Sequence, residues 1–537
     1  TVRVTFLGFE PAFKLQTKTS TSIRHALMQS FTIAANGMAQ SLMISLIALS
    51  GHANETAARA HTSDVPRSPD AELGPAWLAG DHHIHSRYSV GWNNDTNPPT
   101  PILGGDAIYP IAMNAVMARQ HGLDWMVTTD HGGPNHSRVH LNHAYPELLE
   151  SREAVPDVIQ FLGMEFDTPA ADHTSLIFPQ TDFEIKDLVK IEEEFNSREF
   201  WPADPGKNTE QQMLLALSAM KRLPAPPLLI AHHPSRSASG LRQYGKTTPR
   251  EMRSWNDQAP NIAVGMEGSP GHQAITQSQE RFGPSKLSKY LGDSRPRGIY
   301  GSVLGGHPTM GGFDQMTAVV GGFWDSMLGE GRRWWITANS DSHTHWRDGG
   351  ADFWPGEYSK TYVYALKNPA SIFAAIRAGR MFVVTGDLIS ALAFRASSKT
   401  QTARIGQSIA VDRGGDIDIY IEVVESITAN AGGRLPKVKR VDLIRGKIEA
   451  APQDLSADEN ATARVQERFL VNTTREAGTP IRLAYKFENV QESFYVRLRG
   501  TNGEEREPLE DPDGEDPWSD LWFYSNPIFV EVSQSGG

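Results

Sequence analysis

The sequence predicts an α/β fold in which parallel strands alternate with helices, followed by a C-terminal antiparallel β domain. Three observations predict it. Strand-like and helix-like segments alternate in the middle of the chain, and several strand-like runs stop on histidine or a carboxylate. From about residue 388, the pattern changes to segments in which apolar and polar residues alternate. Strands that alternate with helices imply parallel pairing and a sheet covered by helices. In such folds, ligands lie at the carboxyl ends of the strands.

Five short apolar runs end on side chains that bind metals. They are WLAGDHHIH with His83 and His85, DWMVTTDH with Asp130 and His131, VIQFLGMEF with Glu165, LLIAHHP with His233, and WWITANSDSH with Asp341 and His343. Imidazole and carboxylate together suit divalent ions such as Zn, Mn or Fe. Residues two apart on a strand project from one face, and the first and last runs both have this spacing. The sequence therefore predicts a metallohydrolase.

Helix-like segments separate these runs. Residues 107–122 carry apolar residues at helical spacing and stop at Gly122, residues 209–223 predict another helix, and residues 370–380 close the series. All eighteen histidines lie at or before His345, so the last 192 residues (537 minus 345) contain none. The chemistry is therefore expected in the first two thirds of the chain.

The C-terminal part has the pattern of antiparallel strands. Residues 417–423 and 493–499 alternate apolar with polar side chains, which is typical of strands with one buried face. We expect a β-sandwich over residues 388–537, packed on the preceding domain. Without histidine, it is expected to be a scaffold or a wall of the substrate channel.

Composition sets the outer bounds. With 39% hydrophobic residues in 537, the chain is expected to be soluble and globular with an ample core. A net charge of -12 argues against binding nucleic-acid polymers, which depends on Lys and Arg that neutralise phosphates. The absence of cysteine excludes disulfides, thiolate ligands and cysteine nucleophiles.

The N-terminus predicts export. Residues 41–53, SLMISLIALSGHA, form an apolar run that ends on a small-x-small pattern, with basic residues upstream. We expect a signal segment over residues 1–53, a linker over 54–77, and a periplasmic or secreted protein; an ordinary N-terminal helix of a cytoplasmic protein is the alternative. The run is too short to span a bilayer, so no stable membrane insertion is expected.

Several motifs resemble those of the polymerase and histidinol phosphatase (PHP) family. GDHHIHSRYSVG resembles its opening HxHxxxS motif, and GLDWMVTTDH resembles its second motif. GMEF, AHHPSR and NSDSH are similar to its later segments and follow in the family's order. The resemblance spans about residues 78–387 and, with the C-terminal β domain, is closest to the larger PHP proteins.

The resemblance implies a distorted (β/α)7 barrel that holds two or three divalent ions (Mn, Zn or Fe). One ion would take His83, His85, Glu165 and Asp341. Glu165 would bridge to a second ion held by His233 and His173, and a third would use His131 and His343. Many members have a further ligand where this chain has Val90 and Gly91, so Asn94, Asp95 or Asp106 would have to substitute, or the third site is weak or empty.

Other polar residues near the motifs have less specific expectations. His82 and His232 adjoin ligand candidates and are expected on the opposite face. Asp81 and Asp130 are candidates to orient imidazole rings. The remaining histidines of interest, His136, His140 and His143, are expected at the surface or at the rim of a pocket.

The expected activity is hydrolysis of a small-molecule ester. We predict a metal-dependent phosphodiesterase in which a hydroxide that bridges two ions attacks phosphorus. Arg236 is the first candidate to bind phosphoryl oxygens, and Arg87 and Lys246 are weaker candidates. A structural ion pair is the alternative role for Arg236. His131 or His343, where not bound to metal, would protonate the leaving group.

Three alternatives stay open. A phosphomonoesterase would use the same metals. A carbamate or carboxyl ester hydrolase, similar to the carbaryl hydrolases that some PHP relatives resemble, would also use metal-bound hydroxide, so the sequence separates it poorly from a phosphodiesterase. A non-catalytic metal-binding module would keep the ligands without the reaction.

Overall fold

The computed structural model describes residues 74–275, 307–348, 350, 352–452, 454–476, 478–512 and 515–533. The expected signal segment 1–53 and all but the last residues of the expected linker 54–77 lie outside these ranges. The described residues from Gly74 onward belong to one compact unit of mixed α/β structure.

The first part of this unit alternates strands with helices. Its strands are β1 (Ala76–Ile84), β2 (Gly91–Asn93), β3 (Thr100–Ile102), β4 (Trp125–Thr128), β5 (Ile159–Asp167), β6 (His173–Ile177), β7 (Leu228–Ala231), β8 (Ala263–Pro270), β9 (Trp335–Asn339), β10 (Ser359–Ala365) and β11 (Met381–Thr385). Its helical segments are α2 (Ile111–Gln120), α3 (His136–Val139), η1 (His140–Ala144), α4 (Tyr145–Ala154), α5 (Glu184–Phe195), η2 (Pro205–Lys207), α6 (Glu210–Met220), α7 (Pro249–Gln258), α8 (Gly271–Ile275), α11 (Gln315–Ala318), α12 (Phe323–Gly329), η3 (Trp346–Asp348) and α13 (Pro369–Arg377).

The predicted helices are confirmed, with ends that follow from their capping residues. α2 stops before Gly122, whose positive φ of 77° favours glycine. α6 begins after Thr209, whose side chain accepts a hydrogen bond from Gln212 N. α13 begins in the same way after Asn368 and ends before Gly379.

The strands pair in the order β10-β1-β4-β5-β6-β7-β8-β9. Pairing is parallel for β1–β4, β4–β5, β7–β8 and β8–β9, as expected, whereas β6 runs antiparallel to both of its neighbours. Because β6 is reversed, its first residue, His173, pairs with Asp167 at the end of β5. The carboxyl ends of the parallel strands and the start of β6 therefore meet at one edge.

The two ends of this strand series are linked at the same edge. Asp341 N donates to His83 O at 3.0 Å, and His85 N donates to Ser342 O at 2.9 Å. A parallel bridge joins Ile84 to Ser342. This link between β1 and the segment after β9 is compatible with a barrel that closes there.

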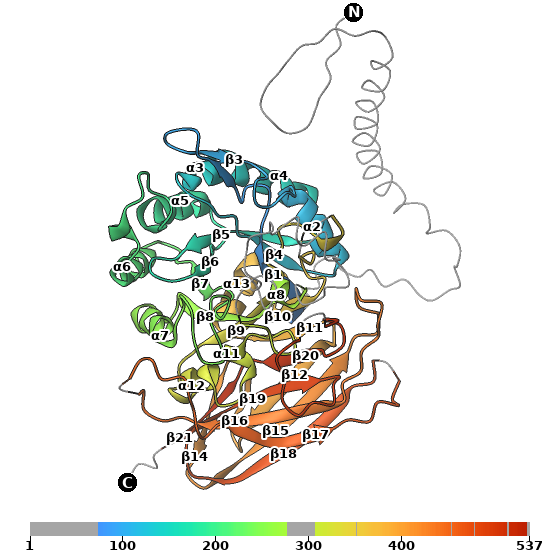
Figure 1. Cartoon of the computed structure of the whole chain (residues 1–537). Helices are drawn as coiled ribbons and strands as arrows, with labels where there is room; N and C mark the ends of the chain where they lie inside the picture. Colours follow the sequence, from blue (N-terminus) through green and yellow to red (C-terminus); the bar gives the residue numbers. More distant parts are fainter. Residues whose placement is uncertain are drawn as a thin grey trace, which may run out of the picture. The chain divides into compact units, whose positions relative to one another are not determined.

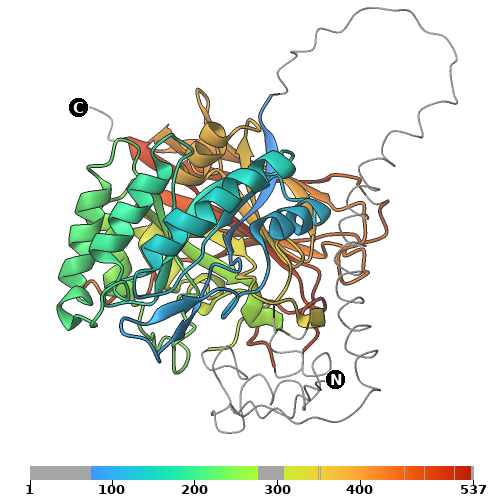
Figure 2. The same cartoon turned by 90° about the horizontal axis from the view of Figure 1, so that it is seen from above.

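Apolar runs explain why these strands are buried. All four residues of β4 are buried and three of them are apolar, which is the near-continuous apolar pattern of a parallel strand covered on both faces. All eight residues of β8 are buried as well, although Glu267 and Ser269 are polar. Helices α5, α6 and α7 cover the outer side of this part of the sheet (Figure 1). In the second view, these helices also lie outside the strands (Figure 2).

The C-terminal part is antiparallel β structure, as predicted, except for one parallel pair, Ser408–Asp412 with Ile528–Ser533. Its strands are β12 (Ile389–Ser397), β13 (Thr402–Arg404), β14 (Ser408–Asp412), β15 (Gly415–Glu425), β16 (Arg440–Lys447), β17 (Arg464–Leu470), β18 (Ile481–Val490), β19 (Phe494–Thr501), β20 (Trp522–Ser525) and β21 (Ile528–Ser533). The sheet β13-β12-β15-β18 and residues of β16, β19, β20 and β21 share one hydrophobic core. β15 contains residues 417–423 and alternates as predicted, with one buried face. β19 covers residues 494–499 of the other segment but is buried on both faces, because its Arg497 and Arg499 pair with Asp325 and Asp442 inside the protein.

This β region is continuous with the first part. β20 pairs with β11, and β11 pairs with β10, so the large sheet runs across the expected boundary between residues 387 and 388. The exact domain division therefore stays a prediction, while the two kinds of structure are plain in Figure 1.

Candidate metal centre

The strand ends bring the predicted ligands together. His83, His85, Glu165, His233 and Asp341 lie at the carboxyl ends of β1, β5, β7 and β9, and all five are buried. His131, His173 and His343 lie beside them and are partly exposed.

The first group joins β1 to the segment after β9. His83 Nε2 lies 2.9 Å from His85 Nε2, and Asp341 Oδ1 lies 3.0 Å from each of these nitrogens. Glu165 Oε1 lies 3.3 Å from His83 Nε2. Donor atoms bound to one ion at about 2.0–2.2 Å are expected roughly 3 Å apart, so this spacing fits a single divalent ion.

The hydrogen bonds on the far side of each ring support this fit. His83 Nδ1 donates to Glu267 Oε1 at 2.7 Å. His85 Nδ1 lies 2.8 Å from Ser89 Oγ, whose own hydrogen goes to Asp130 Oδ1 at 3.0 Å, so the imidazole is the donor. Rings held in this way turn both Nε2 atoms toward each other and toward a carboxylate. A metal ion between the three atoms, or a proton on one Nε2, balances such an arrangement.

The second group shares Glu165. Its Oε1 atom lies 2.8 Å from His173 Nδ1 and 3.3 Å from His233 Nε2. His173 Nε2 lies 3.3 Å from Asp167 Oδ1, which favours Nδ1 as the nitrogen that is free to bind an ion. Glu165 therefore stands between the first and second groups, the position that a bridging carboxylate requires.

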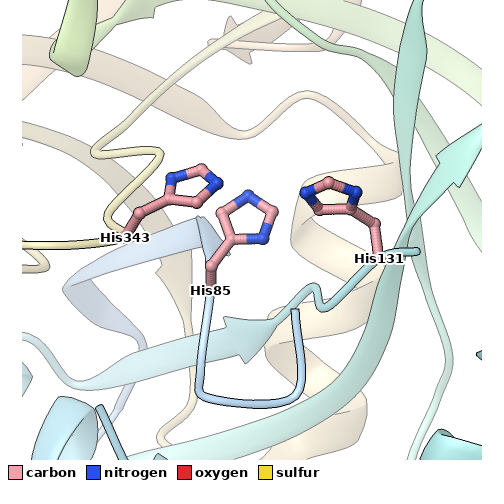
Figure 3. A group of neighbouring side chains, drawn as sticks. All are labelled: His85, His131 and His343. Carbon is pink, nitrogen blue, oxygen red and sulfur yellow. The ribbon is translucent and has the colours of Figure 1, made fainter. Parts of the chain in front are cut away.

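The third group lies at the mouth of the cluster. Figure 3 shows His131 and His343 on either side of His85. The His85 and His343 rings are stacked with centroids 3.9 Å apart, and those of His85 and His131 are 5.1 Å apart. Asp106 Oδ2 lies 3.0 Å from His131 Nε2 and 3.5 Å from His343 Nε2. Of the three residues proposed from sequence to complete this site, Asp106 is the one that reaches it.

The carboxylates control protonation throughout the cluster. Burial opposes charge on His83, but Asp341 and Glu267 raise its pKa well above the usual value. In the same way, Asp106 raises the pKa of His343 to about 10, against the effect of burial. Glu165 is buried, yet the charges of His173 and His131 hold its pKa well below the usual range. The centre thus concentrates negative charge that protons or metal ions must balance.

Two of the ligand candidates have a strained backbone. His233 has a φ of 25° and Asp341 has a φ of 50°, in a region that residues with a β-carbon rarely adopt. Such conformations cost roughly 1–3 kcal/mol and gather at functional sites, where the surrounding fold holds them in place. The strain at both strand ends is a second sign, independent of the side-chain distances, that these positions are functional.

His232 departs from the expected orientation. Its Nδ1 atom lies 2.8 Å from Glu165 Oε1, and its ring stacks on His83 with centroids 3.4 Å apart, so it faces the cluster. The reason is the turn that follows β7, where the alternation of a regular strand no longer applies. His82 instead lies among hydroxyls, 3.0 Å from Ser175 Oγ and 2.7 Å from Thr337 Oγ1, as expected for a residue on the other face.

The two aspartates expected to orient imidazoles act differently. Asp130 reaches His85 only through Ser89 and also accepts from Ser86 N at 2.6 Å. Asp81 has no hydrogen bond to an imidazole among the described residues; it accepts from His83 N and Ser340 N, each at 3.0 Å. Asp81 therefore ties together the backbones at the ends of β1 and β9.

Two of the three predicted anion-binding residues, Arg236 and Arg87, are engaged in ion pairs. Arg236 Nη2 donates to Asp172 Oδ1 at 2.7 Å, and Arg87 pairs with Glu147. Arg236 still belongs to the site, because its positive charge, after burial, is the main influence that lowers the pKa of His233 to about 3. The ion pair leaves its expected role as an oxygen clamp untested.

His136 and His140 are buried, contrary to expectation. Their Nδ1 atoms lie 2.9 and 2.7 Å from the two oxygens of Glu192. The three residues form a group outside the main cluster, held between α3, η1 and α5. Surface placement failed as a prediction because a carboxylate from α5 satisfies both rings. His143 is exposed, as expected.

Sequence analysis missed Glu267. This fully buried residue on β8 contacts His83 Nδ1 and accepts from His233 N at 2.5 Å. A signal was present: Gly265-Met266-Glu267 repeats the Gly163-Met164-Glu165 tripeptide, again at the end of an apolar strand. The repeated tripeptide identifies β8 as a further strand that ends in the site.

Together these residues define a candidate site for divalent metal ions. No protein-family model and no curated protein matches the chain. Among solved structures, it is similar to a two-domain protein from Bacteroides vulgatus, described as containing a predicted PHP-like metal-dependent phosphoesterase. The similarity covers 89% of this chain and 100% of that one, at 12% identity and a TM-score of 0.35. We therefore infer the metal site from the distances between its own side chains and not from this similarity.

Within the described ranges, no helix is both long and apolar enough to cross a membrane.

Proposed function

We propose that the protein is a metal-dependent hydrolase of the PHP type that cleaves phosphodiesters. The observation that carries this proposal is the convergence of His83 Nε2, His85 Nε2 and Asp341 Oδ1 within 3.0 Å of one another. Glu165 adjoins them and also faces His173 and His233, so one carboxylate connects two groups of ligands. Bound divalent ions would supply an activated water and would offset charge on the attacked group.

The residues of this chain would hold the ions and orient the ester. His83, His85, Glu165 and Asp341 would hold one ion; Glu165, His173 and His233 would hold a second; His131 and His343 would hold a third. His131, His173 and His343 have side-chain exposures of 13%, 19% and 22%, so they form the face that a substrate would meet. Where either is free of metal, His131 or His343 is placed to give a proton to the leaving group.

The ion pair of Arg236 favours substrates of low charge. A guanidinium that binds a dianion usually offers both of its forked nitrogens. Here one of them bonds to Asp172, whose negative charge offsets part of the attraction for an anion. A singly charged phosphodiester is therefore a better fit than a phosphomonoester. The same observation keeps carbamate or carboxyl ester hydrolysis as the second candidate, because those substrates are neutral.

The test is turnover on matched substrates. Metal-reconstituted protein would be assayed on p-nitrophenyl esters of a phosphodiester, a phosphomonoester and a methylcarbamate, which share one leaving group. Dominant diester turnover that is lost in the His83→Ala, Asp341→Ala variant supports the proposal. His143→Ala, a histidine variant outside the cluster, should keep wild-type rates.

The other outcomes also decide. Dominant carbamate turnover with the same loss in the variant would assign carbonyl hydrolysis to the same site. Turnover that survives in the His83→Ala, Asp341→Ala variant, or no turnover of any of the three esters by metal-loaded protein, would contradict a hydrolase at this centre.

A further inference from the structure

The third group of the cluster differs from what the family resemblance implies. Positions 90 and 91, where a ligand is expected, hold Val90 and Gly91, and neither side chain can bind a metal. The structure instead brings in a carboxylate from farther along the chain. Asp106, between β3 and α2, places Oδ2 3.0 Å from His131 Nε2 and 3.5 Å from His343 Nε2.

Two glycines make this approach feasible. A β-carbon on Gly105 would lie 2.7 Å from Gly91 N and 3.0 Å from Gly91 Cα, closer than side chains tolerate. The loop that carries Asp106 therefore passes directly over the position where a ligand was expected. The backbones of Gly91 and Gly105 are in contact where a ligand side chain was expected. Asp106, which follows Gly105, reaches the two histidines.

Backbone hydrogen bonds fix this loop to the segment after β1. Gly104 N donates to Arg87 O at 2.8 Å, and Arg87 N donates to Tyr109 O at 2.7 Å, so both ends of the loop are tied to one residue. Ala107 N also donates to Ser89 O at 3.4 Å. The position of Asp106 is thus built into the fold, although its side chain is 41% exposed.

The hydrogen-bond partners of His343 indicate that a cation belongs between the rings and the carboxylate. His343 Nδ1 donates to Asp341 O at 3.0 Å, so Nε2 is the nitrogen that faces the Asp106 carboxylate and is available to a metal ion. His131 Nδ1 is buried without a hydrogen-bond partner among the described residues, so its Nε2 is the nitrogen that contacts Asp106. Three electron-rich groups meet here, as in the first group.

We propose that Asp106 is a metal ligand that completes a third ion site with His131 and His343. This inference rests on the proposed function, because it assigns a residue to the same metal centre. It replaces the ligand expected at positions 90 and 91 with one delivered by a separate loop. Since Asp106 is the most exposed member of the cluster, the third ion exchanges with solvent more readily than the two held by buried residues.

The experiment measures metal content. Full-length wild-type, Asp106→Asn and Asp95→Asn proteins would be reconstituted with Mn²⁺ or Zn²⁺, desalted, and analysed by inductively coupled plasma mass spectrometry. Asp106→Asn keeps the size of the side chain and removes its charge. Asp95 is the matched control, because it is an exposed aspartate of the preceding loop and was an equal candidate from sequence.

We expect three ions per wild-type and Asp95→Asn chain, and two per Asp106→Asn chain. In a chelator titration, the wild-type protein should lose one ion first, and Asp106→Asn should lack that step. Asp106→Ala should behave like Asp106→Asn. Circular dichroism spectra of the metal-free proteins should agree, which shows that each variant is folded. Metal-free Asp106→Asn should unfold at a somewhat lower temperature, because it loses the charged contact of Asp106 with His131 and His343.

Three results would overturn the inference: a wild-type protein that holds only two ions, an Asp106→Asn protein that still holds three, or one that loses all of its metal. The first two would mean that Asp106 and His343 form an ordinary ion pair. The outcome is separate from that of the proposed function, because the loss of one ion is measured even if no ester is hydrolysed. Conversely, ester turnover with equal metal content in all variants would leave the function standing and remove Asp106 from the site.

Discussion

His83 Nδ1 lies 2.7 Å from Glu267 Oε1, although the two residues are 184 positions apart in the sequence. Both are fully buried. The bond fixes the ring so that Nε2 faces His85, Glu165 and Asp341. Glu267 also accepts from His233 N at 2.5 Å, so one carboxylate orients the ends of both β1 and β7. Burial raises the pKa of Glu267, and the charge of His83 opposes that rise.

Replacement of Glu267 should weaken metal binding. Partners that orient a ligating imidazole typically contribute about 10–100-fold to metal affinity. Glu267→Gln is expected to lower affinity by a factor in this range, because an amide neither carries the charge nor fixes the ring in one orientation. Competition against a chelator of known affinity measures it. Glu192→Gln, which alters another buried carboxylate bonded to imidazoles, should leave the affinity of the main cluster within about twofold. Equal losses in both variants would refute the specific role of Glu267.

Glu192, by contrast, is expected to contribute to folding stability. Its oxygens contact His136 and His140 inside the protein, and the loss of one partner from a buried ion pair costs about 3–5 kcal/mol. Glu192→Gln should lower the free energy of unfolding by an amount of this order in denaturant titrations at pH 7. The metal content of the reconstituted protein should not change. A lower metal content with unaltered stability would instead assign this group to metal binding.

The Glu192 contribution should depend on pH. Burial opposes its charge, but His140 and His136 lower its pKa from 4.5 to about 2. A carboxylate with a depressed folded pKa stabilises the protein above its unfolded pKa and loses that effect as the pH falls toward the folded value. The stability difference between wild type and Glu192→Gln should therefore shrink below about pH 4.5. The pKa of His136 is raised in the folded protein. Its contribution to the free energy of unfolding is therefore fully present below its unfolded pKa and declines as the pH rises through its folded pKa. A difference that grows as the pH falls below about 4.5 would contradict this account.

The β region should depend on a buried ion pair. Arg497 of β19 binds both oxygens of Asp325 of α12, at 2.8 and 2.7 Å, and both side chains are fully buried. Asp325→Asn leaves the guanidinium without a counter-charge, so we expect a loss of about 3–5 kcal/mol in unfolding free energy. Glu422→Gln removes the partner of the largely exposed Arg482 and should cost less than about 1 kcal/mol. Similar losses in the two variants would show that burial does not decide the contribution.

Arg236 should distinguish the two candidate reactions. If it binds a phosphoryl oxygen as well as Asp172, Arg236→Gln removes a charged hydrogen bond worth about 1.5–3 kcal/mol and lowers kcat/KM for a phosphodiester by roughly tenfold or more. A neutral methylcarbamate should lose much less. Steady-state rates on the two p-nitrophenyl esters give the comparison. The control for altered electrostatics is Arg198→Gln, which removes the ion-pair partner of Asp167, a carboxylate that also contacts His173. Unchanged diester kinetics in Arg236→Gln would leave Arg236 with a structural role only.

Local patterns predicted some of the elements. Apolar runs located β1, β4, β5, β7 and β9, helical spacing located α2, α6 and α13, and alternation located β15 and β19, because each signal depends on residues close together in the chain. The direction of β6 was beyond reach, since a strand of five residues has the same pattern whichever way it runs. That reversal is what brings His173 to the edge where the other ligands lie.

The sequence by itself determined which residue types the site would use and which strand ends would carry them, because imidazole and carboxylate side chains at the ends of apolar runs are visible without a fold. Only the tertiary structure decided how they pair. It turned His232 toward Glu165, buried His136 and His140 against Glu192, and placed Glu267 behind His83. It also selected Asp106 over Asp95, two acidic residues that look equivalent in the sequence. The physical reason is that distances between atoms far apart in the chain depend on strand register, turn geometry and the close approach of Gly91 and Gly105, none of which is encoded in the spacing of residues.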